Sequence, residues 1–187
     1  MGLHIKLNTT TLAGTTILAA LVVVFDYTLK YSNLKIPFPL MPVLKFDFTG
    51  IPIALAMLLF GLIPGFFTSI IALIAILARS GDIVGASMKA IAEFSTIVGM
   101  AIGLKTTKKL RLVIMFSMGL IMRVLVMIPI NLLLISFGVM KVQGVLAIVV
   151  LLIVVFNILQ GIITIFGGYS IYEIIKKHMP SIPNNAR

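Results

Sequence analysis

The sequence contains no cysteine, and only five of its 187 residues are acidic. Without cysteine the chain can form neither a disulfide bond nor a thiolate metal site. Five carboxylates in total are too few for metal-dependent chemistry on hard cations. Charged residues make up only 11% of the chain, against roughly 25% in a soluble domain. The sequence therefore excludes a large water-soluble domain.

Membrane-embedded enzymes need catalytic groups that this chain does not bring together. Intramembrane proteases use a Ser/His pair, paired aspartates or an HExxH motif, but His4 and His178 lie at opposite ends of the sequence. Membrane alcohol phosphotransferases use clustered aspartates, whereas Asp26, Asp47 and Asp82 are isolated. No GxxxxGK[ST] loop is present. We therefore expect no enzyme, and any ATP-driven work must come from a partner.

What the chain does contain is long apolar runs. Hydrophobic residues make up 60% of it, and the mean hydropathy is +1.22. We predict an all-α integral membrane protein with one domain over residues 1–187, whose residues 178–187 form a disordered tail. The six expected transmembrane helices cover about 10–29, 48–62, 64–79, 86–104, 112–137 and 145–175.

The net charge of +10 does not indicate a nucleic-acid partner, because the cations are scattered over the ends of the expected helices. Topology and contact with anionic membrane lipids explain them better. The side of the two termini would hold Lys6, Lys105, Lys108, Lys109, Arg111, Lys176, Lys177 and Arg187. The other side would hold Lys30, Lys35, Lys45, Arg79 and Lys141, offset by three aspartates. The positive-inside rule then predicts cytoplasmic N- and C-termini.

Two further features of the sequence invite a functional interpretation. Residues 31–45 contain Pro37, Pro39 and Pro42, which forbid a helix and favour extended turns, so this apolar loop is either a lid or a plug for the bundle end. Small residues crowd the first helix and let another helix approach closely, either in this chain or in a partner. These small residues are Ala13, Gly14, Ala19 and Ala20.

Polar side chains inside the expected helices are the candidate binding residues. Asn157 and Gln160 share one helix face, and in hydrocarbon their amides need either another helix or a ligand as partner. Asn131, Glu93 and Arg123 lie inside other expected helices. Glu93 follows Lys89 by four residues, a spacing that allows a self-neutralising pair, while Arg123 could contact a backbone carbonyl, Glu93 or a ligand.

Three short segments carry a family resemblance. They are residues 44–52 (LKFDFTGIP), 60–65 (FGLIPG) and 156–161 (FNILQG). They resemble the second-helix opening, the FG-x-x-x-G turn and the FN-x-x-KG motif of the substrate-binding S components of energy-coupling factor (ECF) vitamin transporters, especially the riboflavin-binding ones. Gln160 stands where the family motif has a lysine, and Gly50 stands where the riboflavin-binding members commonly have an acidic residue.

The resemblance implies a membrane subunit that binds riboflavin as its transported ligand, without a cofactor. It implies that Asn157 and Asn131 bind the flavin ring and that Leu40 and Met41 belong to the loop that closes over the ligand. Gln160, Lys45, Glu93 and Arg123 complete the candidate set. The small residues of the first helix would dock the transmembrane coupling subunit, which works with ATP-binding subunits.

Other functions remain open on the sequence. The amides could serve only to bridge helices in a membrane scaffold or accessory subunit, or the chain could be an S component for a different vitamin. A stand-alone channel or carrier is a third alternative, although no inverted repeat is evident.

Overall fold

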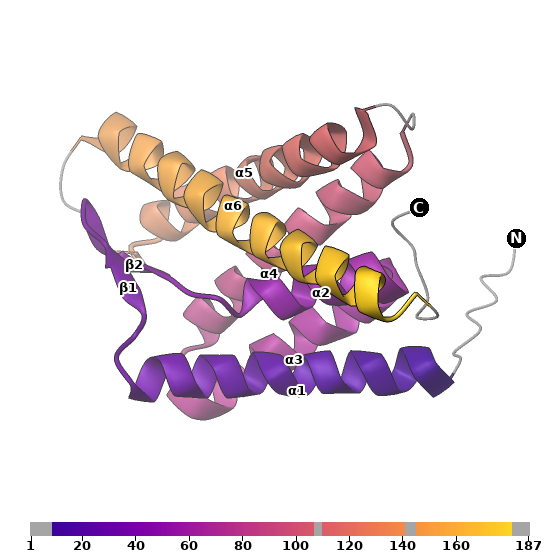
Figure 1. Cartoon of the computed structure of the whole chain (residues 1–187). Helices are drawn as coiled ribbons and strands as arrows, with labels where there is room; N and C mark the ends of the chain where they lie inside the picture. The colour runs from indigo at the N-terminus through magenta and orange to yellow at the C-terminus, as the bar shows by residue number, and fades with distance from the viewer. Residues whose placement is uncertain (1–8, 107–109, 141–144, 181–187) are drawn as a thin grey trace, which may run out of the picture.

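A computed structural model describes residues 9–106, 110–140 and 145–180 (Figure 1). Within these residues the chain forms six helices and one two-stranded antiparallel hairpin. The elements are α1 (Thr9–Tyr31), β1 (Ile36–Phe38), β2 (Met41–Phe46), α2 (Gly50–Phe60), α3 (Leu62–Ser80), α4 (Ile83–Leu104), α5 (Arg111–Ser136) and α6 (Leu146–His178).

Five of the described helices, all except α2, are long and apolar enough to cross a membrane. α2 has 11 residues and is therefore only about 16 Å long, short of a hydrocarbon core of about 30 Å. The expected segment 48–62 is thus shorter than a full span. Asp47 and Thr49 lie directly before α2 and form a turn, in which Asp47 Oδ1 accepts hydrogen bonds from the backbone N–H and hydroxyl of Thr49.

α2 lies at the centre of the bundle rather than at its edge. It packs against α1, α3, α4 and α6, and nearly all of its side chains are buried. A helix that is apolar on all sides is stable only in such a position. Gly61 ends α2 with φ of 103°, a conformation that favours glycine, and α3 starts at the next residue. The tight turn in the FGLIPG segment thus depends on Gly61.

The first turn of α1 and the last turn of α6 lie at the same end of the bundle, and the hairpin lies at the opposite end (Figure 1). α6 continues through His178, further than expected. Residues 181–187 of the predicted tail lie outside the described residues, as do five of the cations used in the topology prediction: Lys6, Lys108, Lys109, Lys141 and Arg187.

The proline-rich segment forms more regular structure than the extended turns we expected. β1 and β2 pair with a register irregularity between Pro37 and Phe38. Phe38 packs against Phe46 and against Phe156 of α6, with ring centroids 5.8 and 5.9 Å apart. This aromatic contact holds the hairpin over the first half of α6.

The small residues of α1 divide between two faces. Gly14 lies against the ring of Phe60, and Ala19 is buried in the bundle. Ala13 and Ala20 are exposed. In this structure Gly14 and Ala19 therefore pack within the chain, and only Ala13 and Ala20 are accessible to a partner.

Candidate functional site

A cavity of about 690 Å³ lies toward the hairpin end of the bundle, between β2 and helices α4, α5 and α6. Its size is within the usual range for small-molecule sites. Six of the eight predicted binding residues line it: Asn157, Gln160, Asn131, Lys45, Glu93 and Arg123. The other lining residues are Leu44, Asp47, Asp82, Val84, Gly85, Met88, Lys89, Ala92, Met127, Leu134, Val139, Met140 and Phe156.

Leu40 and Met41 do not line the cavity. Leu40 lies at the tip of the hairpin and is 68% exposed. Met41 is buried in a small apolar cluster with Phe38, Val149 and Ile153. In this structure Met41 packs against α6 with the hairpin, and Leu40 is exposed at the hairpin tip, so neither belongs to the cavity wall.

Gln160 holds the chain where it enters the bundle ahead of α2. Its Nε2 donates to the backbone carbonyl of Asp47 at 2.8 Å, and its Oε1 accepts from the backbone N–H of Asp47 at 3.3 Å. Asp47 is buried and belongs to neither β2 nor α2, so its backbone groups need partners from elsewhere in the fold. Bridging between segments, one of the two functions considered for the amides, is thus what Gln160 does.

The Asp47 carboxylate lines the cavity and belongs to a larger charge network. It forms an ion pair with Lys89 of α4, and Lys35 lies 4.0 Å away. Burial by itself would raise the pKa of Asp47, but Lys89, Lys35 and the Thr49 hydroxyl together hold it below its ordinary value. Lys35 also pairs with Asp26 at 2.6 Å, and Asp26 in turn pairs with Arg79.

The predicted pairing of Lys89 with Glu93 on one helix is therefore wrong, since each residue has its partner outside α4. Glu93 pairs with Arg123 of α5, with 3.1 Å between Oε1 and Nη1. Its Oε2 accepts a hydrogen bond from Thr164 of α6 at 3.2 Å. Glu93 is fully buried, and a buried carboxylate is stable only when paired in this way.

Arg123 links the three helices that line the cavity. Its Nη1 donates to Thr96 on α4 at 3.1 Å, and its Nε donates to Asn157 Oδ1 on α6 at 3.3 Å. The contact with Glu93, one of the partners considered for Arg123, is therefore present in the structure. The guanidinium thus fixes α4, α5 and α6 relative to one another.

The two asparagines keep part of their hydrogen-bonding capacity. Asn157 Nδ2 donates to the carbonyl of Ile153 at 2.9 Å, and Asn131 Nδ2 donates to the carbonyl of Met127 at 2.7 Å. A primary amide has two N–H donors and an oxygen with two acceptor sites, so each side chain uses only part of what it offers. Among the described residues, no donor is bonded to Asn131 Oδ1.

The positive and negative side chains that line the cavity are equal in number. Lys45, Lys89 and Arg123 are offset by Asp47, Asp82 and Glu93. Asp82 is occupied as the N-cap of α4, where it accepts from the backbone N–H of Gly85. Such a lining favours a ligand without a large net charge. The described residues contain no group of three His, Asp or Glu side chains that could hold a metal ion.

Sequence reasoning missed Lys89, Asp47 and Asp82 as members of the site. Asp47 and Lys89 are 42 residues apart, and no local pattern predicts such a pair. A usable signal was the position of all three polar residues close to the hairpin end of the expected helices, where the other candidates also converge.

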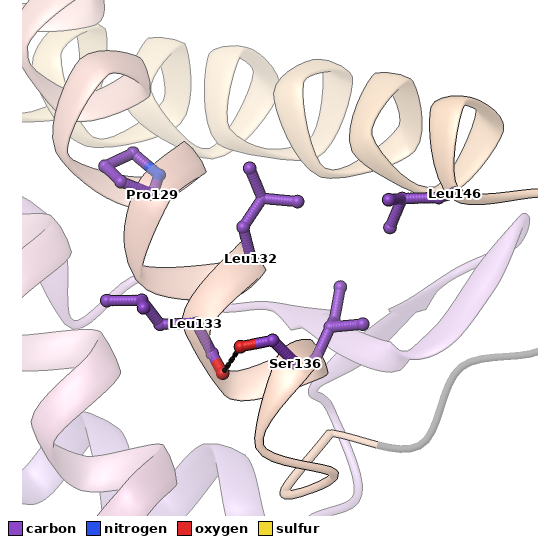
Figure 2. Close-up of a pocket in the computed structure, with 6 residues that line it drawn as sticks. Pro129, Leu132, Leu133, Ser136 and Leu146 are labelled. Atoms are coloured by element: carbon purple, nitrogen blue, oxygen red, sulfur yellow. Dashed lines mark hydrogen bonds between the residues drawn. The ribbon is translucent and has the colours of Figure 1, made fainter.

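A second, apolar hollow lies between the C-terminal part of α5 and the start of α6 (Figure 2). Pro129, Leu132, Leu133, Ile135, Ser136 and Leu146 line it. Its one hydroxyl, Ser136 Oγ, donates to the carbonyl of Leu133 at 2.8 Å, as the dashed line in Figure 2 marks. Leu133 and Leu146 are more than half exposed, so this hollow belongs to the outer apolar surface and contains none of the predicted binding residues.

Of three comparisons with known proteins, the one with solved structures finds a match, and it concerns the fold. No protein-family model matches the sequence, and no curated protein matches it. Among solved structures, the chain is similar to one described as the S component of a bacterial ECF transporter, with a TM-score of 0.78 and 23% sequence identity. The match covers 91% of this chain and 98% of that chain. The described helices therefore adopt the fold of an ECF transporter S component.

Proposed function

We propose that this chain is the membrane-embedded substrate-binding subunit of an ECF-type transporter and that its cavity binds riboflavin or a related vitamin. The observation that carries the proposal is a cavity of about 690 Å³ into which partly unused polar groups of α5 and α6 converge. The shared fold with an S component supports it.

The lining suits an uncharged aromatic heterocycle. Phe156, Met88 and Met127 offer an apolar and polarisable wall for a ring system. The spare amide groups of Asn131 and Asn157 can serve the alternating donors and acceptors of a flavin's pyrimidine end. The balanced charges along the wall favour such a neutral ligand over a strongly anionic one.

The proposed direction of transport is based on the two ends of the bundle. The hairpin and the cavity lie at the same end of the bundle, and we place that end on the extracellular side of the cell membrane. The opposite end carries Lys105, Arg111, Lys176 and Lys177 and faces the cytoplasm. Since the sequence has no nucleotide-binding loop, ATP-binding subunits supply the energy through a coupling subunit that docks on α1 at Ala13 and Ala20.

The test is riboflavin binding by the purified protein in detergent, measured by isothermal titration and by quenching of flavin fluorescence. We expect tight binding that is lost in Asn157→Leu and weakened at least tenfold in Asn131→Ala. Asn33→Gly is the matched control, because Asn33 is an exposed amide in a turn with φ of 53°, which glycine accepts. Absence of binding to riboflavin and to a panel of other vitamins by the folded wild-type protein contradicts the proposal.

The scaffold alternative has one observation in its favour, namely that the Gln160 amide is fully used by the chain itself. A thermal-shift screen separates the two functions. A scaffold gains no stability from vitamins, whereas a binder saturated at about 100 times its Kd gains roughly 2.7 kcal/mol. The unused groups of Asn131 and Asn157 favour the binder.

A further inference from the structure

We infer that Lys89 contacts the ligand, with its ammonium group donating hydrogen bonds to a carbonyl oxygen on the edge of an aromatic heterocycle. The inference rests on the proposed function, because it concerns the same cavity. It assigns a binding residue that neither the sequence pattern nor the fold match indicates.

Lys89 has hydrogen-bond donors to spare. An ammonium group carries three N–H donors, and within the described part of the chain its partner is the Asp47 carboxylate. Its side chain is 16% exposed, against 4% for Arg123. Lys89 lines the cavity, so this accessible part and the unused donors are available to a bound molecule.

The other strong donors of the cavity are less suited to this contact. Both ends of the Gln160 amide are bonded to the backbone of Asp47. Arg123 uses Nε and Nη1 on Asn157 and Thr96, pairs with Glu93, and has a nearly inaccessible side chain. Lys45 lies on β2 and is exposed, so water competes for its ammonium group.

The pairing of Lys89 with Asp47 defines the chemical class of the acceptor. A ligand carboxylate or phosphate would bring a second anion to an ammonium that Asp47 already neutralises. A carbonyl oxygen can accept the spare N–H bonds without that repulsion. Met88, Met127 and Phe156 line the same cavity and provide apolar surface for a flat ring whose carbonyl edge faces Lys89.

Two residues act on this contact indirectly, as positioning residues. Asp47 holds the Lys89 ammonium, and Gln160 holds the backbone of Asp47. The ammonium is thereby fixed relative to both α4 and α6 before a ligand arrives. Preorganised donors of this kind lose little freedom on binding.

The experiment compares wild type with Lys89→Met, Lys89→Gln and Lys89→Arg, and with Lys30→Met as the matched control. Lys30 is an exposed lysine at the end of α1 and does not line the cavity. Riboflavin affinity is measured by the quenching of flavin fluorescence on binding. Infrared difference spectra of riboflavin labelled with ¹³C at its ring carbonyls report hydrogen bonding to those oxygens directly.

We expect Lys89→Met to raise the riboflavin Kd about 10- to 100-fold and to abolish the downshift of one ring-carbonyl band on binding. Lys89→Gln should keep a smaller downshift, Lys89→Arg most of it, and Lys30→Met all of it. A carbonyl band that is shifted equally in wild type and in folded Lys89→Met or Lys89→Gln overturns the inference while leaving the proposed function intact. Failure of the wild-type protein to bind riboflavin overturns the flavin proposal itself, so the two failures are distinct.

Discussion

The side-chain amide of Gln160 pairs with both backbone polar groups of Asp47, a residue 113 positions earlier in the chain. The amide pairs with Asp47 as a neighbouring β-strand would, because it accepts from the N–H and donates to the carbonyl of the same residue. Non-helical backbone inside a membrane bundle is stable only where such groups have partners. The bond therefore explains how the short helix α2 can begin inside the bundle.

Replacing Gln160 with leucine should destabilise the protein by roughly 2–4 kcal/mol, because it leaves two buried backbone groups without partners. Gln160→Glu should be nearly as harmful, since a carboxylate cannot donate to the Asp47 carbonyl. Thermal unfolding in detergent measures both. Gln160→Asn tests whether the amide must reach the Asp47 backbone, because the asparagine side chain is one methylene shorter. Full stability of that variant would contradict the two hydrogen bonds between Gln160 and Asp47.

Asp47→Asn tests the charge at the centre of the network. The folded pKa of Asp47 is below its ordinary value of 3.8, so its charge contributes stability that is present above pH 3.8 and lost as the pH falls below it. Asp47→Asn should therefore be less stable than wild type at neutral pH. Their melting temperatures should converge on acidification below about pH 4. If the melting temperatures of the two proteins instead differ by the same amount at every pH in that range, the Asp47 charge does not contribute this stability.

Gly50→Ala should destabilise the protein by roughly 1–3 kcal/mol through overpacking. A Cβ at Gly50 would collide with Thr164 Oγ1 and with the Glu93 carboxylate, both of which are buried and bonded to each other. Gly138→Ala is unsuitable as a control because Gly138 has a positive φ. Ser136→Ala, an exposed site at the end of α5, is the better reference and should change the melting temperature little.

Much of the architecture could be predicted because it depends on local composition. Apolar runs indicated all five long helices, and the glycine at position 61 indicated the turn after α2. The prolines of residues 31–45 excluded a helix there, but the pairing of β1 with β2 and its cover over α6 depend on aromatic contacts with Phe156. Such contacts join distant parts of the chain and have no local signature.

In the candidate site, too, the sequence indicated the residues but not the contacts between distant segments. Polar residues in apolar helices indicated which side chains line a cavity, since burying them without partners is costly. Their partners could not be predicted in the same way. The i, i+4 spacing favoured Lys89 with Glu93, but the packing of the chain brings Asp47 to Lys89 and Arg123 to Glu93.

Ala20→Phe should block assembly with a coupling subunit while leaving riboflavin binding unchanged. Ala20 is exposed on α1 and away from the cavity, so a large ring there prevents close approach of another helix. Co-purification with the coupling and ATP-binding subunits is the measurement. Leu12→Phe, an exposed position with an already large side chain, is the control. Normal assembly of Ala20→Phe would place the docking surface elsewhere.

The Glu93–Arg123 pair should show strong coupling in a double-mutant cycle. Arg123→Met alone leaves a fully buried carboxylate with only the Thr164 hydroxyl as donor, and should cost about 3–5 kcal/mol. Glu93→Met alone leaves the guanidinium without its counter-charge and should also be harmful. The double variant should lose less stability than the sum of the two single losses, because neither charge is then buried alone.

Unfolding of all three variants, followed by circular dichroism during titration with a denaturing detergent, gives the coupling energy. Additive losses would mean that Glu93 and Arg123 are stabilised independently, by Thr164 on one side and by Thr96 and Asn157 on the other.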